Sequence, residues 1–115
     1  MSIHRSVLKR ESFRGITTGR KLAPVHPGDV LLADFIEPLG ITRYRLAKAI
    51  GVRQRRIDEI CAGTRAITAD TAVRLGLAFG IDPQFWLNLQ SQYDLEVVQR
   101  EQGERLSETV QVLTA

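Results

Sequence analysis

The sequence predicts an all-α protein, a bundle of five helices with short connections between them. Two observations support this fold class. Apolar residues recur at the spacing of one helix face, as Ala72, Leu75 and Phe79 do. Residues that start or stop helices bound each such stretch, and no segment alternates apolar and polar residues as a half-buried strand would.

Length and composition favour one small domain with a modest core. The chain has 115 residues, 43% of them hydrophobic, and one cysteine. No apolar run approaches the ~20 residues needed to cross a membrane, and the N-terminal part lacks the apolar stretch of a signal peptide. A single cysteine offers no disulfide framework, so we expect the protein in the reducing cytoplasm.

The net charge of +3 conceals a strong asymmetry along the chain. Residues 1–25 have a net charge of +5, residues 26–81 have +2, and residues 82–115 have −4. Excess basic charge suits the phosphates of a nucleic acid, so the acidic C-terminal part should face away from them.

Residues 1–25 show no sustained periodicity and mix Ser, Thr, Gly and Arg. We interpret them as a basic, flexible N-terminal arm. Two roles stay open for it: a disordered tail, or a segment that becomes ordered on a DNA or protein partner.

The first helix is expected from Pro27 to about Glu37. Pro27 suits a helix start because its missing N–H is not needed there. Pro38 cannot continue a helix interior, so the helix should stop before it.

The next two helices form a close pair. Thr42 can cap the first of them with its hydroxyl, and Gly51 can close it because glycine adopts positive φ at little cost. Ile57 and Ile60 should face inward from the second helix, and Gly63 marks its end. Two short helices joined by a tight turn containing glycine are the DNA-binding helix-turn-helix pattern.

Two further helices complete the bundle. Thr68 should cap the fourth helix and Gly80 should close it. The fifth should begin at Pro83 and end near Arg100, because Gly103 interrupts the pattern. The folded domain is therefore placed at residues 26–101, and residues 102–115 are expected to form a polar tail.

Nothing in the residues themselves favours catalysis or a cofactor. There is no nucleophile–base pair, no phosphate loop and no metal-ligand spacing, since His4, His26 and Cys61 are too scattered for a zinc site. His26 is interpreted as a surface or packing residue and Cys61 as a packing residue. We therefore expect a protein that is not an enzyme.

Three stretches of the sequence carry a family resemblance. They are HPGDVLLADFIEPLG (His26–Gly40), GVRQRRIDEICAGTRAITADTAVRLGLAFG (Gly51–Gly80) and DPQFWLNLQSQYDLE (Asp82–Glu96). They resemble the Cro/C1-type (XRE) helix-turn-helix family, which has a lambda-repressor-like DNA-binding fold. The first and last stretches are more specific and resemble its HigA branch of antitoxins, also called the virulence-associated protein I or addiction-module antidote family.

This resemblance implies a sequence-specific, homodimeric repressor that binds double-stranded operator DNA and regulates its own operon. It also implies a HigB-like partner toxin, an mRNA-cleaving ribonuclease that the antitoxin neutralises. The alternative is a stand-alone regulator of the same family without a toxin. The long basic arm is not part of the family pattern and keeps that alternative open.

The resemblance also implies which residues read DNA, because the second helix of the motif lies in the major groove and its first residues face base edges. Gln54 and Arg55 are then the leading readers, since Gln pairs bidentately with adenine and Arg with guanine. Glu59, one turn further on, can accept from cytosine N4. The alternative for Glu59 is a solvated charge that excludes wrong bases or pairs with Arg55 or Arg56.

Phosphate contacts are expected from four arginines, Arg43, Arg53, Arg56 and Arg65. Arg43 matches the position that contacts phosphate in this fold. Arg53 departs from the family, because the position before the recognition helix is usually a capping Ser or Thr. Arginine cannot accept from the free N–H groups at that terminus. The first turn of the recognition helix should therefore be looser, or water or a DNA phosphate should accept from these N–H groups.

A bulky cluster on the fifth helix comprises Phe85, Trp86, Leu89 and Tyr93. We expect Phe85 and Leu89 in the core, and Trp86 and Tyr93 at a dimer interface, because aromatic residues are enriched at interface centres. The fifth helix would then serve as the dimerisation helix. A homodimer also suits a palindromic operator, whose half-sites lie ~34 Å apart.

Overall fold

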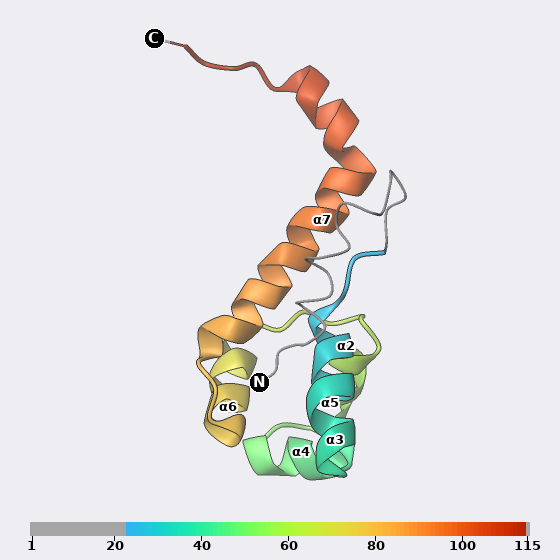
Figure 1. The fold of residues 1–115 in the computed structure, drawn as a ribbon, viewed down its shortest axis with the longest axis vertical. Coiled ribbons are helices and arrows are strands. Elements are labelled where there is room, and N and C mark those ends of the chain that lie inside the picture. Colours follow the sequence, from blue (N-terminus) through green and yellow to red (C-terminus); the bar gives the residue numbers. More distant parts are fainter. Residues whose placement is uncertain (1–22, 115) are drawn as a thin grey trace.

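The computed structural model describes residues 23–114, so the expectations for residues 1–22 of the arm lie outside the described residues. The helical elements are α2 (Pro27–Val30), η2 (Leu31–Ile36), α3 (Glu37–Leu39), α4 (Arg43–Ile50), α5 (Gln54–Cys61), α6 (Ala69–Phe79) and α7 (Pro83–Thr109). The first three elements follow one another without a break and form one rod (Figure 1). The described residues thus contain five helical rods and no strand, which confirms the all-α fold class.

The first rod begins at Pro27 as expected but ends later than expected. Its middle, η2, is a π-helical segment, in which hydrogen bonds reach one residue further back than in an α-helix. The N–H of Glu37 accordingly donates to the carbonyl of Leu32. This shift of register puts Pro38 in the first turn of α3, where no N–H is needed. The rod therefore continues to Leu39 instead of stopping near Glu37.

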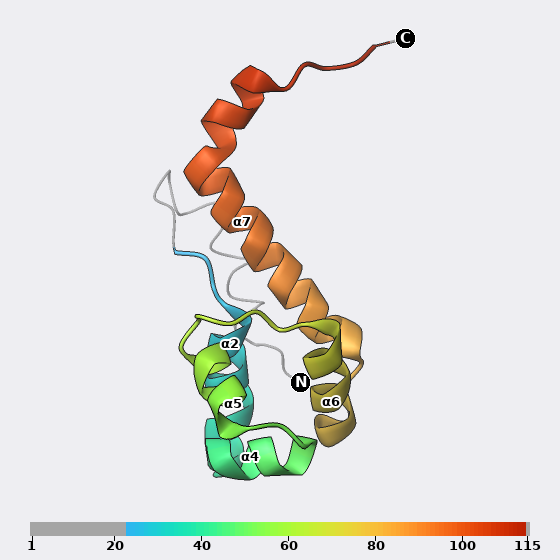
Figure 2. The same cartoon turned by 180° about the vertical axis from the view of Figure 1, so that it is seen from behind.

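The predicted helix-turn-helix is formed by α4 and α5, and its turn chemistry is confirmed. The Oγ1 of Thr42 accepts a hydrogen bond from the N–H of Arg45 at 3.0 Å and so caps α4. Gly51 ends α4 with φ 76°, in the left-handed region that favours glycine. Figure 2 shows α4 at the end of the bundle, with α5 beside α2.

Helix α7 is longer than the sequence predicted. It starts as expected, with Oδ1 of Asp82 accepting from the N–H of Gln84 at 2.9 Å. It then runs through Gly103 to Thr109, so the expected end near Arg100 is wrong, and residues 102–109 of the predicted polar tail are helical. One glycine costs a helix only ~1 kcal/mol relative to alanine, and its neighbours are good helix formers.

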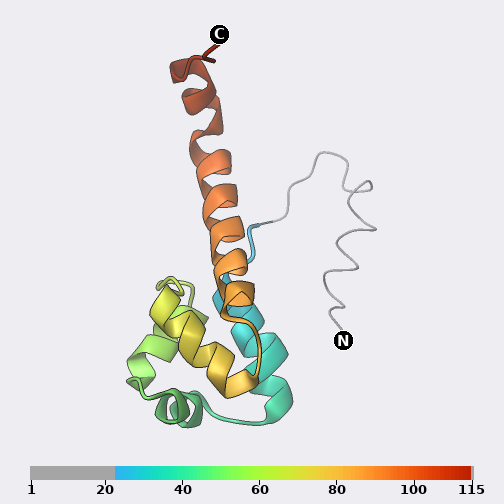
Figure 3. The same ribbon diagram turned by 90° about the vertical axis from the view of Figure 1, so that its left-hand side faces the viewer.

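The C-terminal half of α7 extends beyond the other described helices (Figure 3). Leu95 and Val98, near the middle of α7, are 61% and 41% exposed. Within residues 23–114, no helix combines the length and the apolarity that a membrane crossing requires.

The core gathers around Trp86, whose side chain is fully buried. The centroid of its ring lies 5.0 Å from that of Phe35 and 5.0 Å from that of Phe85. The expectation that Trp86 lies at a dimer interface is therefore wrong, because its side chain has no surface left for a second copy. Leu89 packs against the core as expected, whereas Phe85 is 37% exposed and lies at the edge of the core.

Candidate nucleic-acid interface

Helix α5 buries one face and leaves the other open. Ile57 and Ile60 are fully buried in the core. Gln54 and Arg55, the predicted base readers, are exposed in its first turn, and the side chain of Arg55 is 83% exposed. The helix thus presents an amide and a guanidinium at its N-terminal end, the groups that pair bidentately with adenine and guanine edges.

The N-terminal end of α5 has no side-chain cap, as the sequence predicted. Arg53 occupies the N-cap position with extended backbone, and its side chain makes no capping hydrogen bond. By contrast, the hydroxyls of Thr42 and Thr68 cap α4 and α6. The end of α5 therefore lacks an oxygen that its first N–H groups need, and such an end suits an anion.

Glu59 joins two arginines across this surface. Its Oε2 accepts from Nε of Arg55 at 2.9 Å, and its Oε1 accepts from Nε of Arg65 at 2.9 Å. The hydrogen bond from Arg55 is the largest cause that holds the pKa of Glu59 below its ordinary value. Of the alternatives considered for Glu59, the ion pair with Arg55 is present, and the second partner is Arg65. Each oxygen already accepts from one arginine, so a cytosine would have to share an oxygen of Glu59 with a guanidinium.

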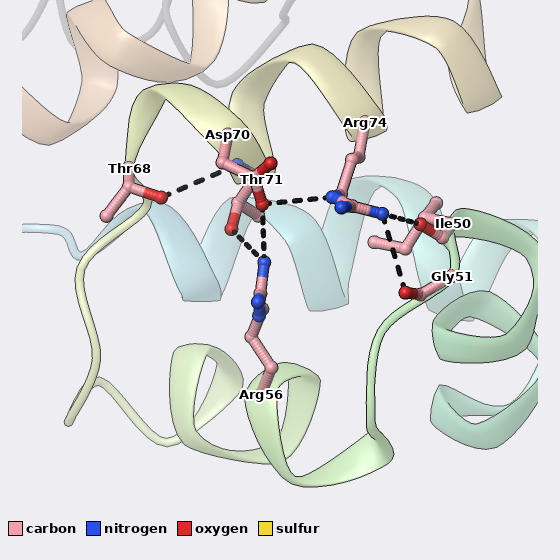
Figure 4. Close-up of polar contacts among 7 residues, drawn as sticks. All are labelled: Ile50, Gly51, Arg56, Thr68, Asp70, Thr71 and Arg74. Carbon is pink, nitrogen blue, oxygen red and sulfur yellow. Dashed lines mark hydrogen bonds and ion pairs between the residues drawn. The ribbon is translucent and has the colours of Figure 1, made fainter.

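Arg56 faces α6, although it is one of the four predicted phosphate contacts. Its guanidinium donates to Oδ2 of Asp70 at 2.8 Å and to Oγ1 of Thr71 at 3.3 Å (Figure 4). The side chain is 30% exposed. The guanidinium of Arg56 is therefore bound by other residues of the protein, and it joins the recognition helix α5 to α6.

The remaining phosphate candidates stay at the surface. The guanidinium of Arg43 lies 3.7 Å from Oδ1 of Asp58, too far for a hydrogen bond, and the side chain is 43% exposed. Arg65 is 45% exposed beside its pair with Glu59. Among residues 23–114, Arg53 takes part in no ion pair. Arg53 lies at the N-terminal end of α5, whereas Arg43 and Arg65 lie beside Asp58 and Glu59 further along the helix.

Arg74 is a residue that the sequence analysis did not single out. Its Nε donates to Oδ2 of Asp70 at 2.9 Å, and another nitrogen of its guanidinium donates to the carbonyl of Ile50 at 2.7 Å. The pair between residues 70 and 74 could have been anticipated, because opposite charges four residues apart meet on a helix surface. The contact with Ile50 could not, since it joins positions 24 residues apart.

Tyr93, the second residue predicted at a dimer interface, packs within the protomer. Its ring meets the ring of His26 edge-on, with centroids 4.8 Å apart and an angle of 74°. His26 is itself buried and caps α2, because its Nδ1 accepts from the N–H of Gly28 at 2.9 Å. Tyr93 remains half-buried. A role for it at an interface stays a prediction.

Cys61 does not have the surroundings of an activated nucleophile. It is half-buried at the end of α5, and burial is the largest cause that raises the pKa of its thiol. Reactive cysteines have lowered pKa values, so this shift has the opposite sign.

Comparison with known proteins places these helices among DNA-binding proteins. Residues 32–86 match a family model described as helix-turn-helix. Virulence-associated protein I of Dichelobacter nodosus is 44% identical over 87 residues, which cover 75% of this chain and 81% of that protein. Antitoxin HigA-1 of Vibrio cholerae is 41% identical over 75 residues, covering 65% of this chain and 70% of that protein. The solved structure of Pseudomonas aeruginosa antitoxin HigA with the higBA promoter matches with a TM-score of 0.76 and 35% identity, over 79% of this chain and 99% of that one.

Proposed function

The chain belongs to the Cro/C1-type helix-turn-helix family, in the branch of the HigA antitoxins and virulence-associated protein I, and from this premise we propose that it represses its own operon. It binds double-stranded operator DNA as a homodimer. It also neutralises a HigB-like, mRNA-cleaving ribonuclease toxin.

One observation carries the DNA-binding part of the proposal: the first turn of α5 is uncapped and exposes Gln54 and Arg55. A helix inserted in the major groove reads bases with the residues of its first turn. In the bound state a backbone phosphate would accept from the free N–H groups at this end and pair with Arg53. The Pseudomonas aeruginosa relative, whose structure includes promoter DNA, supports this mode of binding.

The roles proposed for the other residues follow from their exposure. Arg43 and Arg65 contact phosphates, because their guanidinium groups lie at the surface beside α5. Glu59 holds Arg55 towards the groove and does not itself need to touch a base. Each phosphate contacted contributes about −0.9 to the slope of log affinity against log salt concentration.

Helix α7 is the element that we propose for the homodimer. Near its middle the apolar side chains of Leu95 and Val98 are exposed, and burying them against a second copy is favourable. Because Trp86 is enclosed in the core, the interface must use such residues together with Tyr93. Two copies would present two recognition helices to a palindromic operator.

The toxin part of the proposal rests on family membership alone, so it needs its own test. Footprinting and titration of the DNA upstream of the gene test repression, and co-expression with the product of the neighbouring open reading frame tests neutralisation. We expect a protected site and a complex that survives purification. Protection without a complex would favour a stand-alone regulator, and the absence of any preferred site would overturn the repressor proposal.

A further inference from the structure

Asp70 joins two arginines from different helices at a single oxygen. Its Oδ2 accepts from Arg56 of α5 at 2.8 Å and from Arg74 of α6 at 2.9 Å (Figure 4). Hydrogen bonds of this kind, between charged groups, are stronger than those between neutral groups and depend on direction. The arrangement therefore links the start of α6 directly to the recognition helix.

Arg74 extends this arrangement to the end of α4. Its guanidinium donates to the carbonyl of Ile50 at 2.7 Å and lies 3.4 Å from that of Gly51. Carbonyls at the C-terminal end of a helix have no donor within the helix, and a cation there also suits the helix dipole. Helix α6 thus holds the turn of the helix-turn-helix as well as its second helix.

The contact with α5 is anchored on a rigid partner. Arg56 also donates to Oγ1 of Thr71, which is only 2% exposed. The inner face of α5 is held by Ile57 and Ile60, whose apolar packing has no preferred direction. Burial of Ile57 and Ile60 keeps α5 against the core and limits its rotation, and the directional bonds of Arg56 add a second restraint on the side towards α6.

We propose that Asp70 is a positioning residue for DNA reading, which fixes the orientation in which α5 presents Gln54 and Arg55. It also engages one nitrogen of Arg56 within the protein, because both N–H groups of Nη1 are directed at Asp70 and Thr71. This proposal rests on the proposed function and names the residue on which its specificity depends. Asp70 touches no base in this role and acts through Arg56 and Arg74.

The test is Asp70→Asn in the full chain, measured by titration with operator DNA and with random-sequence DNA at several salt concentrations. We expect the ratio of the two affinities to fall about fivefold or more, as when one bidentate base contact is misplaced. The salt slope should steepen by about 0.9 for each phosphate that the released arginine contacts. Asp70→Glu keeps the carboxylate and should restore most of the ratio.

Glu101→Gln serves as the matched control, since it removes one exposed negative charge on α7, which is not the helix that carries Asp70. It should leave the affinity ratio and the salt slope unchanged. If Asp70→Asn behaves like this control, Asp70 does not position the recognition helix. If Glu101→Gln shifts the affinity ratio and the salt slope as much as Asp70→Asn does, the effect is one of net charge and the proposal is also overturned.

Hydrogen exchange in the free protein separates this proposal from the proposed function. Amides of residues 57–61, whose N–H groups donate within α5, should exchange faster in Asp70→Asn than in the wild type, whether or not an operator is known. Unchanged exchange would overturn the positioning role by itself. Faster exchange combined with a wild-type protein that prefers no DNA sequence would instead overturn the repressor function.

Discussion

The guanidinium of Arg55 donates from Nε to Oε2 of Glu59 at 2.9 Å, one turn further along α5. The other oxygen of Glu59 accepts from Arg65, so one carboxylate aligns two cations at the edge of the recognition helix. A long, exposed arginine loses conformational freedom when it binds a base, and a partner that already holds it lowers that cost.

Gln54→Ala and Arg55→Ala should each weaken binding to the operator by about 1–3 kcal/mol, because each removes one bidentate contact with a base edge. Binding to random DNA should change little for Gln54→Ala. Fluorescence titration with both DNAs measures this, and Gln92→Ala, an exposed change on α7, is the control. Two variants that bind the operator as the wild type does would refute the assignment of the readers.

Glu59→Gln should reduce discrimination against altered operators at the base pair that Arg55 reads, since the side chain keeps only one oxygen for two guanidinium groups. Overall affinity at low salt should rise, because one negative charge is lost beside the DNA. A panel of operators with single base changes locates the effect. If discrimination is lost instead at a cytosine, Glu59 is a base reader and not a partner of Arg55.

The folded protein should lose stability as the pH falls below the ordinary pKa of histidine, about 6.5. Burial lowers the pKa of His26 and outweighs the opposing charges of Asp29 and Asp94, so the unfolded chain binds this proton first. Stability is lost between pH 6.5 and the lower pKa of the folded state, where protonated Nδ1 can no longer accept from Gly28. Thermal unfolding of His26→Asn, which keeps a capping oxygen without titrating, should show a flatter pH profile.

Trp86→Ala should destabilise the fold by about 3–5 kcal/mol, the usual cost of removing a large buried aromatic side chain. Trp86→Phe should cost less and should leave the oligomeric state unchanged, because the residue has no exposed surface. Chemical denaturation and light scattering measure the two quantities. If the wild type is a dimer and Trp86→Phe is stable but monomeric, Trp86 contributes to the dimer interface after all.

Gly28→Ala should unfold the protein or severely lower its free energy of unfolding. A Cβ at residue 28 would lie 1.7 Å from the carbonyl oxygen of Ile60, and that atom belongs to the backbone of α5. Gly103→Ala is the matched control, since nothing lies within 4 Å of its Cβ position. It should stabilise the protein by up to about 1 kcal/mol, the difference in helix propensity. Denaturation midpoints of the two variants should therefore move in opposite directions.

The sequence could predict the helices and their ends because these depend on a few neighbouring residues. The cap at Thr42, the glycine at Gly51 and the missing cap at Arg53 were all anticipated and are present. The errors have local physical causes as well. A π-helical register carried the first rod past Pro38, and one glycine at residue 103 did not outweigh a long run of helix-forming neighbours.

The sequence by itself determined the fold class, the helix-turn-helix and the two exposed residues that open α5. Only the tertiary structure decided which charged groups remain free for a ligand. Arg56 pairs with Asp70, 14 positions away, and Arg74 reaches Ile50, 24 positions away. The tertiary structure also decided that Trp86 belongs to the core, with Phe85 at the edge of that core. Such partnerships depend on how the helices pack against one another, and no spacing along the chain encodes that packing directly.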